Sequence, residues 1–112
     1  MVMKLEKLDL DKLYIDLQNK KKKSVNKSYT SFLLNNKQIL AKKIGEESTE
    51  VLIEFFNNNK ENLIKESADL LYHLNVMWLS LDISPKDIWK ELYKRKNTSG
   101  FTEKENRKKN DI

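Results

Sequence analysis

The chain has 112 residues, of which 38% are hydrophobic and 35% are charged, so it is long enough for one domain with a small core but polar for a monomer. The absence of cysteine excludes disulfides and thiolate metal sites, and the lack of a long apolar run or a signal-peptide core excludes a membrane span; we therefore expect a cytoplasmic protein. The net charge of +5 comes mostly from lysine in an asparagine-rich chain, which is typical of AT-rich coding, so basicity alone is weak evidence for a nucleic-acid partner.

The first half of the chain begins with helical patterns. Residues 5–18 repeat apolar side chains at i, i+3, i+4 and i+7 from Leu10, which predicts an amphipathic helix. Residues 19–27 are rich in lysine, asparagine and serine and predict a loop. Ser28 is placed to cap a short helix that ends near Asn35.

Four consecutive lysines, Lys20–Lys23, lie in that loop and are the best candidate for a nucleic-acid patch. No aromatic residue interrupts them and they border a polar stretch, so a solvated linker is the favoured interpretation. An attractive field for a polyanionic small substrate is the remaining alternative.

Two long helices are predicted on either side of an asparagine turn. The first covers residues 36–56, with an apolar stripe that extends to Phe55. Asn57–Asn59 has no periodicity and predicts the turn, and the second helix covers residues 60–81. The two helices are therefore expected to pack as an antiparallel hairpin within an all-α bundle.

A last helix is predicted to start at the Ser-Pro-Lys-Asp motif of residues 84–87 and to end near Lys96. The serine is a cap, the proline suits the first helical position, and the aspartate lies in the first turn. Residues 97–112 are polar, with Gly100 as a breaker, and predict a mobile or extended tail. The helical domain is thus expected to comprise residues 1–96.

Four carboxylates form two matched pairs on the long helices, Glu47 with Glu50 and Glu66 with Asp69. Residues three apart share one face of a helix, and the antiparallel hairpin sets the two pairs opposite each other in the same register. Carboxylates on a face that turns inward require pairing, protonation or a cation. An all-oxygen ligand set predicts a magnesium or manganese site, and ordinary surface charge is the alternative.

Residues beside the first acidic pair have two interpretations each. Lys42 and Lys43 lie one turn before Glu46 and Glu47, which fits either simple ion pairs or contact with a substrate phosphate. Gly45 lies in the middle of a helix, where it costs about 1 kcal/mol relative to alanine. Close approach of a helix or a ligand would explain this glycine, and so would chance.

His73, the only histidine, lies one turn beyond Asp69 and is interpreted as a hydrogen-bonding support for the ligands rather than a catalytic base. Trp78 and Trp89 are interpreted as packing or interface residues. The segment Ser28–Thr30 precedes a helix, so it is either a cap or a phosphate grip formed by hydroxyls.

Three strings resemble the signature of the phosphoribosyl-ATP pyrophosphohydrolases of histidine biosynthesis, which belong to the wider MazG-like all-α nucleotide pyrophosphohydrolases. The strings are KKIGEESTEV at Lys42–Val51, ESADLLYHL at Glu66–Leu74, and Ser28-Tyr29-Thr30 followed by Phe32–Leu34. They occur in the order and near the spacing of the family. The resemblance extends from about Leu8 to Lys104 and departs from the family at Lys27 and in the strongly basic segment before it.

The resemblance implies an antiparallel helix bundle completed by dimerisation, in a cytoplasmic homodimer or higher oligomer. It also implies magnesium-dependent cleavage of phosphoribosyl-ATP to phosphoribosyl-AMP and pyrophosphate. In many organisms this domain is fused to the cyclohydrolase of the next step, and this chain is expected to be the stand-alone form.

The expected mechanism assigns the metal to four carboxylates: Glu47, Glu50, Glu66 and Asp69. Glu46 is a further ligand or orients water, and either Glu46 or Glu50 takes the proton from the attacking water. Positive charge for the pyrophosphate comes from Lys42 and Lys43, which precede this cluster. The remaining substrate contacts come from the hydroxyl side chains of Ser28, Tyr29 and Thr30.

Two other functions remain open. A MazG-type enzyme would hydrolyse free nucleoside triphosphates. A non-enzymatic basic helical module would recruit nucleic acid or a partner helix, with salt-sensitive binding that is indifferent to magnesium.

Overall fold

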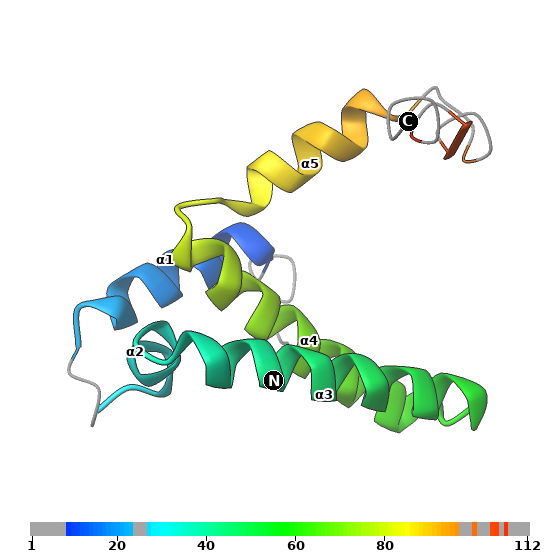
Figure 1. The fold of residues 1–112 in the computed structure, drawn as a ribbon, viewed down its shortest axis with the longest axis horizontal. Coiled ribbons are helices and arrows are strands. Elements are labelled where there is room, and N and C mark those ends of the chain that lie inside the picture. Colours follow the sequence, from blue (N-terminus) through cyan, green and yellow to red (C-terminus); the bar gives the residue numbers. More distant parts are fainter. Residues whose placement is uncertain (1–8, 24–26, 97–99, 101–103, 106, 108–112) are drawn as a thin grey trace, which may run out of the picture.

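The computed structural model describes residues 9–23, 27–96, 100, 104, 105 and 107. This part of the chain is helical and has no strand, as predicted (Figure 1). Helices α3 and α4 form the long hairpin, α1 and α2 cover one end of it, and α5 extends away from it. The helices are α1 (Leu10–Lys21), α2 (Tyr29–Leu34), α3 (Lys37–Phe56), α4 (Lys60–Ser80) and α5 (Pro85–Lys94).

The caps predicted from the sequence are present at two helix starts. At α2 the Ser28 hydroxyl oxygen accepts a hydrogen bond from the backbone N–H of Ser31 at 3.2 Å. At α5 Pro85 is the first residue, and the backbone N–H of Ser84 donates to Asp87 Oδ2 at 2.9 Å. These bonds satisfy polar groups that a helix end otherwise leaves without a partner.

The turn between α3 and α4 is made by Asn57–Asn59, as predicted. Asn58 has a φ of 55°, in the left-handed region that asparagine tolerates better than most residues. Asn59 Oδ1 then accepts a hydrogen bond from the backbone N–H of Asn62 at 3.1 Å and caps α4. Local asparagine chemistry thus reverses the chain and sets the register of the hairpin.

Helix α1 is longer at its C-terminal end than the sequence predicted. The loop was expected from residue 19, but α1 continues to Lys21. Lysine is a good helix former, and cations in the last turn interact favourably with the helix dipole. The expected N-terminal part, residues 5–8, lies outside the described residues.

The C-terminal tail is described only at Gly100, Lys104, Glu105 and Arg107. These residues have helical backbone, so an extended tail broken at Gly100 is wrong for them. The other tail positions lie outside the described residues, and the domain boundary at Lys96 stays a prediction.

The hydrophobic core lies at the end of the hairpin that α1 and α2 cover. Its buried apolar side chains are Tyr14, Leu17, Leu33, Leu40, Val76 and Leu79. Near the turn the described residues leave the apolar stripe of α3 largely uncovered, since Phe55 is 58% exposed. Trp78 is half-buried, which fits packing, whereas Trp89 is exposed, so of the two interpretations, packing or interface, only the interface stays a prediction for Trp89. None of the described helices is both long and apolar enough to cross a membrane.

Candidate metal centre and substrate pocket

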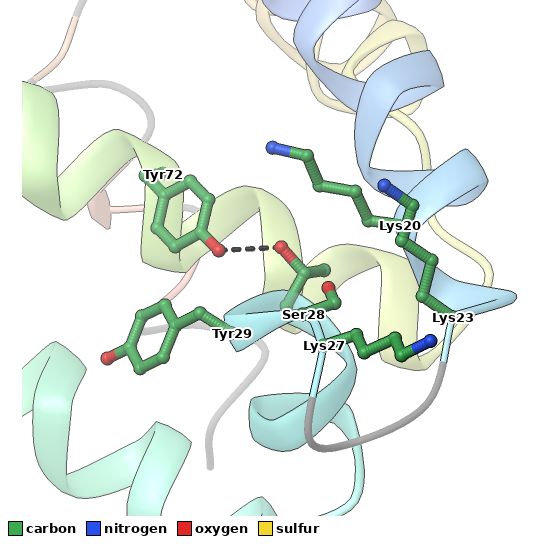
Figure 2. A pocket seen from close by; sticks show the side chains of 7 residues that line it. Lys20, Lys23, Lys27, Ser28, Tyr29 and Tyr72 are labelled. Atoms are coloured by element: carbon green, nitrogen blue, oxygen red, sulfur yellow. Dashed lines mark hydrogen bonds between the residues drawn. The ribbon is translucent and has the colours of Figure 1, made fainter.

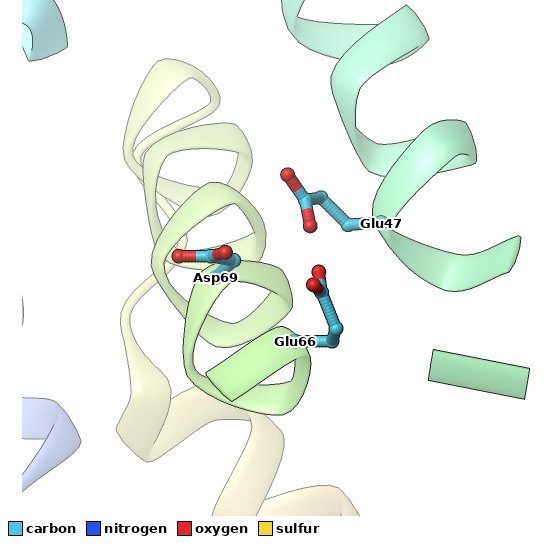
Figure 3. Close-up of side chains that lie close together, drawn as sticks. All are labelled: Glu47, Glu66 and Asp69. Carbon is cyan, nitrogen blue, oxygen red and sulfur yellow. The ribbon is translucent and has the colours of Figure 1, made fainter. Parts of the chain in front are cut away.

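Three of the four predicted metal ligands converge between α3 and α4. Glu47 extends from α3 toward Glu66 and Asp69 on α4 (Figure 3). One carboxylate oxygen from each residue lies within 4.8 Å of the other two. Glu47 and Glu66 are half-buried, whereas Asp69 is exposed at the edge of the cluster.

The cluster contains buried oxygens that require a positive partner. Oε2 of Glu47 and Oε2 of Glu66 are each buried and accept no hydrogen bond from the described part of the chain. Burying a carboxylate oxygen without a donor or a cation is costly. Hard divalent cations bind carboxylate oxygens from several side chains, so this donor set fits such an ion.

Glu50, the fourth predicted ligand, lies beside Glu66. Hydrogen bonding to Glu50, burial, and the negative charges of Glu50 and then Glu47 raise the pKa of Glu66 from 4.5 to about 7. Carboxylates this close share protons unless a cation compensates their charge. The structure therefore brings the two acidic pairs together in the expected register, and their role as ligands stays a prediction.

Glu46 lies beside the cluster and forms ion pairs with two lysines. Its carboxylate is 4.0 Å from Nζ of Lys42 and 3.8 Å from Nζ of Lys43. Ion pairs this exposed contribute little to stability. Glu46, Lys42 and Glu50 also line an open groove of 570 Å³ along α3. The ion-pair interpretation of the lysines is thus confirmed for Glu46, and their contact with phosphate stays a prediction.

Gly45 lies in the same groove with free space around it. A Cβ placed there meets no atom within 4 Å beyond the nearby backbone of its own helix, so close approach of another described helix is wrong as its explanation. We expect Gly45→Ala to raise the free energy of unfolding by about 1 kcal/mol, because alanine is the better helix former. Urea denaturation checks this, and an unchanged or lower value would contradict it. A loss of turnover in the stabilised variant would indicate that a ligand or second subunit approaches this position.

His73 connects the acidic part of α4 to α2. Its Nδ1 lies 2.8 Å from the backbone oxygen of Asp69, and its Nε2 lies 3.3 Å from the Tyr29 hydroxyl. A carbonyl only accepts, so Nδ1 carries the proton and the Tyr29 hydroxyl donates to Nε2. Both nitrogens of this buried ring have partners, which supports a positioning role rather than metal ligation.

The predicted hydroxyl residues line a pocket of 170 Å³ where α1, α2 and α4 meet (Figure 2). Thr30 Oγ1 and the Tyr72 hydroxyl share a hydrogen bond of 2.6 Å, and burial raises the pKa of Tyr72. Ser28 caps α2, so the cap interpretation is confirmed, while contact with substrate stays a prediction. The full lining is Lys20, Lys23, Lys27, Ser28, Tyr29, Thr30 and Tyr72.

The sequence analysis favoured a solvated linker for the basic segment Lys20–Lys23, with an attractive field for a polyanionic substrate as the alternative, and it did not place these lysines in a pocket. Lys20 and Lys23 belong to the segment interpreted as a solvated linker, and Lys27 precedes the Ser28 cap. Because α1 continues to Lys21, the backbone of Lys20 is helical, and its side chain lines the pocket together with residues of α2. The basic segment itself was the available signal, but placing it in a pocket required knowing that the end of α1 packs against α2.

The fold and the site together define an all-α protein with carboxylates on facing helices, an arrangement that builds metal sites in helical bundles. The sequence profile of one family, described as Phosphoribosyl-ATP pyrophosphohydrolase, matches residues 10–96. The chain belongs to this family, so the resemblance of the three motifs is confirmed.

Relatives named phosphoribosyl-ATP pyrophosphatase match nearly the whole chain. The protein of Gluconobacter oxydans (strain 621H) is 43% identical over 105 residues, which are 93% of this chain and 79% of that protein. The protein of Azospirillum brasilense is 41% identical over 100 residues, 88% of this chain and 90% of that protein. The protein of Bacillus cytotoxicus is 40% identical over 103 residues, 91% and 94% of the two chains.

Proposed function

We propose that this protein hydrolyses phosphoribosyl-ATP to phosphoribosyl-AMP and pyrophosphate in histidine biosynthesis. Family membership over residues 10–96 supports the substrate and the reaction. The structural observation that carries the chemistry is the convergence of Glu47, Glu66 and Asp69, where one buried oxygen each of Glu47 and Glu66 accepts no hydrogen bond from the described residues. Phosphoanhydride cleavage depends on positioning and on positive charge near the phosphates, and a cation held by this cluster provides that charge.

In this proposal the carboxylates bind the metal and accept a proton. Glu47, Glu50, Glu66 and Asp69 hold one or more magnesium ions, and manganese is the expected substitute. When bound, magnesium screens the charge of the phosphate oxygens and lowers the pKa of a water. Either Glu46 or Glu50 accepts the proton of the attacking water.

The surrounding side chains bind and orient the substrate. Lys42 and Lys43 supply positive charge for the pyrophosphate leaving group, and their exposed pairs with Glu46 exchange readily for a phosphate. His73 holds the turn of α4 that carries Asp69. The hydroxyl contacts to the rest of the substrate come from Ser28, Tyr29 and Thr30.

We also propose a homodimer or higher oligomer in the cytoplasm. Large apolar side chains remain exposed near the α3–α4 turn: Leu52, Ile53, Phe55, Phe56 and Ile64. Burying one such side chain gains roughly 1.5–3 kcal/mol, and exposed apolar patches mark interfaces. A second copy that covers this end would extend the core along the whole hairpin, and the lack of cysteine fits a reducing compartment.

The double variant Phe56→Lys/Ile64→Lys is expected to shift the assembly toward monomer, because it places charge in the exposed apolar patch. Sedimentation velocity at micromolar concentration measures the change. Ile15→Lys, at an exposed apolar position on α1, is the matched control and should leave the assembly unchanged. A wild-type monomer would contradict the oligomer, and an unchanged double variant would contradict this interface.

The proposed activity is tested by pyrophosphate release from phosphoribosyl-ATP, with magnesium and with a chelator. Hydrolysis that requires magnesium and exceeds that of a panel of nucleoside triphosphates supports the proposal. Preference for free triphosphates would instead indicate a MazG-type enzyme. Salt-sensitive binding of DNA or RNA without turnover, indifferent to magnesium, would indicate the non-enzymatic module.

A further inference from the structure

The pocket beside α2 gathers three cations that the metal site does not use. Lys20 lies in the last turn of α1, Lys23 lies just after the C-cap of that helix, and Lys27 is the residue before the α2 cap (Figure 2). None of the three makes an ion pair with a carboxylate in the described ranges 9–23 and 27–96. The positive charge of this pocket is therefore available to a ligand.

Hydroxyl donors complete the lining. The Ser28 oxygen accepts from the backbone of Ser31, which leaves its hydrogen free to donate. Thr30 and Tyr72 share one hydrogen bond, so one of their two hydroxyl hydrogens also stays free. Ammonium groups and hydroxyl hydrogens together are the donors that bind a phosphate group.

The pocket is small. Its volume is 170 Å³. Pockets that enclose a whole drug-sized ligand span about 300–1,000 Å³. The lysine pocket is therefore suited to one charged group of a larger molecule rather than to a nucleotide.

The position of the pocket relates it to the carboxylate cluster through α4. Tyr72 lies three residues after Asp69, so the two are about one helical turn apart on neighbouring parts of one face. Tyr29, in the pocket wall, is joined through His73 to the backbone of Asp69. Lys42, which lies next to the acidic cluster, comes from α3 and does not line this pocket.

We propose that the lysine pocket binds the 5′-phosphate of the phosphoribosyl group, the phosphate that phosphoribosyl-ATP has and ATP lacks. This inference rests on the proposed function. The substrate carries anionic groups at two separate ends, and the carboxylate cluster with Lys42 and Lys43 serves the triphosphate end. A second cationic site within reach of the same α4 face then selects the substrate, because a site built for a charged group discriminates against an analogue that lacks it.

The test compares the affinities of phosphoribosyl-AMP and AMP, measured by calorimetry on the full chain. These ligands differ only in the phosphoribosyl group. The pocket variant is K20Q/K23Q, and its matched control is K21Q/K22Q, which removes the same charge from exposed neighbours outside the pocket. We expect the preference of the wild type for phosphoribosyl-AMP to fall about tenfold or more in the pocket variant and to persist in the control. Pyrophosphate affinity should stay unchanged in both.

Three results would overturn the pocket assignment: a preference unchanged in K20Q/K23Q, an equal loss in both double variants, or a loss of pyrophosphate affinity in place of the preference. The second would indicate a diffuse field, and the third would place the triphosphate end in the pocket. If the wild type releases no pyrophosphate from phosphoribosyl-ATP, the proposed function itself is contradicted. If the wild type hydrolyses this substrate and the pocket variant keeps its full preference for phosphoribosyl-AMP, only the assignment of the pocket is contradicted.

Discussion

Glu47→Gln and Asp69→Asn are each expected to lower kcat for phosphoribosyl-ATP about 10³-fold or more. Both changes keep the size of the side chain and remove the negative charge that a divalent cation requires. A bound cation contributes several kcal/mol to stabilising charge in the transition state, and each 1.36 kcal/mol corresponds to a tenfold change in rate. Pyrophosphate release at saturating magnesium measures the effect.

The fold is expected to survive these changes, because they relieve repulsion in a cluster where Oε2 of Glu47 and Oε2 of Glu66 are buried and accept no hydrogen bond from the described residues. Circular dichroism should show unchanged helical content. Glu61→Gln is the matched control, since Glu61 is exposed on α4 and forms only a surface pair with Lys65 at 3.5 Å. Near wild-type hydrolysis by either site variant would count decisively against the assignment of the metal centre.

The parts of the fold and site that the sequence predicted depend on local rules. Ser28 and the asparagine turn set helix boundaries through their own hydrogen bonds, and those boundaries fix the spacing along α3 and α4. Once Asn57–Asn59 reverses the chain, helical periodicity alone places Glu47 opposite Glu66. The carboxylate cluster was therefore accessible from spacing and register.

The parts that the sequence did not predict depend on contacts between distant segments. The lysine pocket exists because the end of α1 lies against α2, and no local pattern gives that packing. The exposure of Phe55 and Trp89 likewise depends on what covers the hairpin, and a stripe of apolar residues does not say whether its partner is the same chain or another.

Magnesium affinity is expected to rise about tenfold between pH 6 and pH 8, because the cation must displace a proton from Glu66. The pKa of Glu66 in the metal-free protein is about 7, raised by hydrogen bonding to Glu50, by burial and by the negative charges of Glu50 and Glu47. At pH 6 most Glu66 side chains are protonated and compete with the cation, and at pH 8 most are ionised, so the affinity increases as pH rises through 7.

Calorimetry in buffers of different ionisation enthalpy measures this competition as proton release. About one proton should be released per magnesium bound at pH 6 and close to none at pH 8. His73→Gln is the control, because it removes the one histidine, the side chain that most often titrates near neutrality. The pH dependence should persist in that variant. An affinity that stays constant from pH 6 to pH 8, or a dependence that disappears with His73, would show that Glu66 does not hold the competing proton.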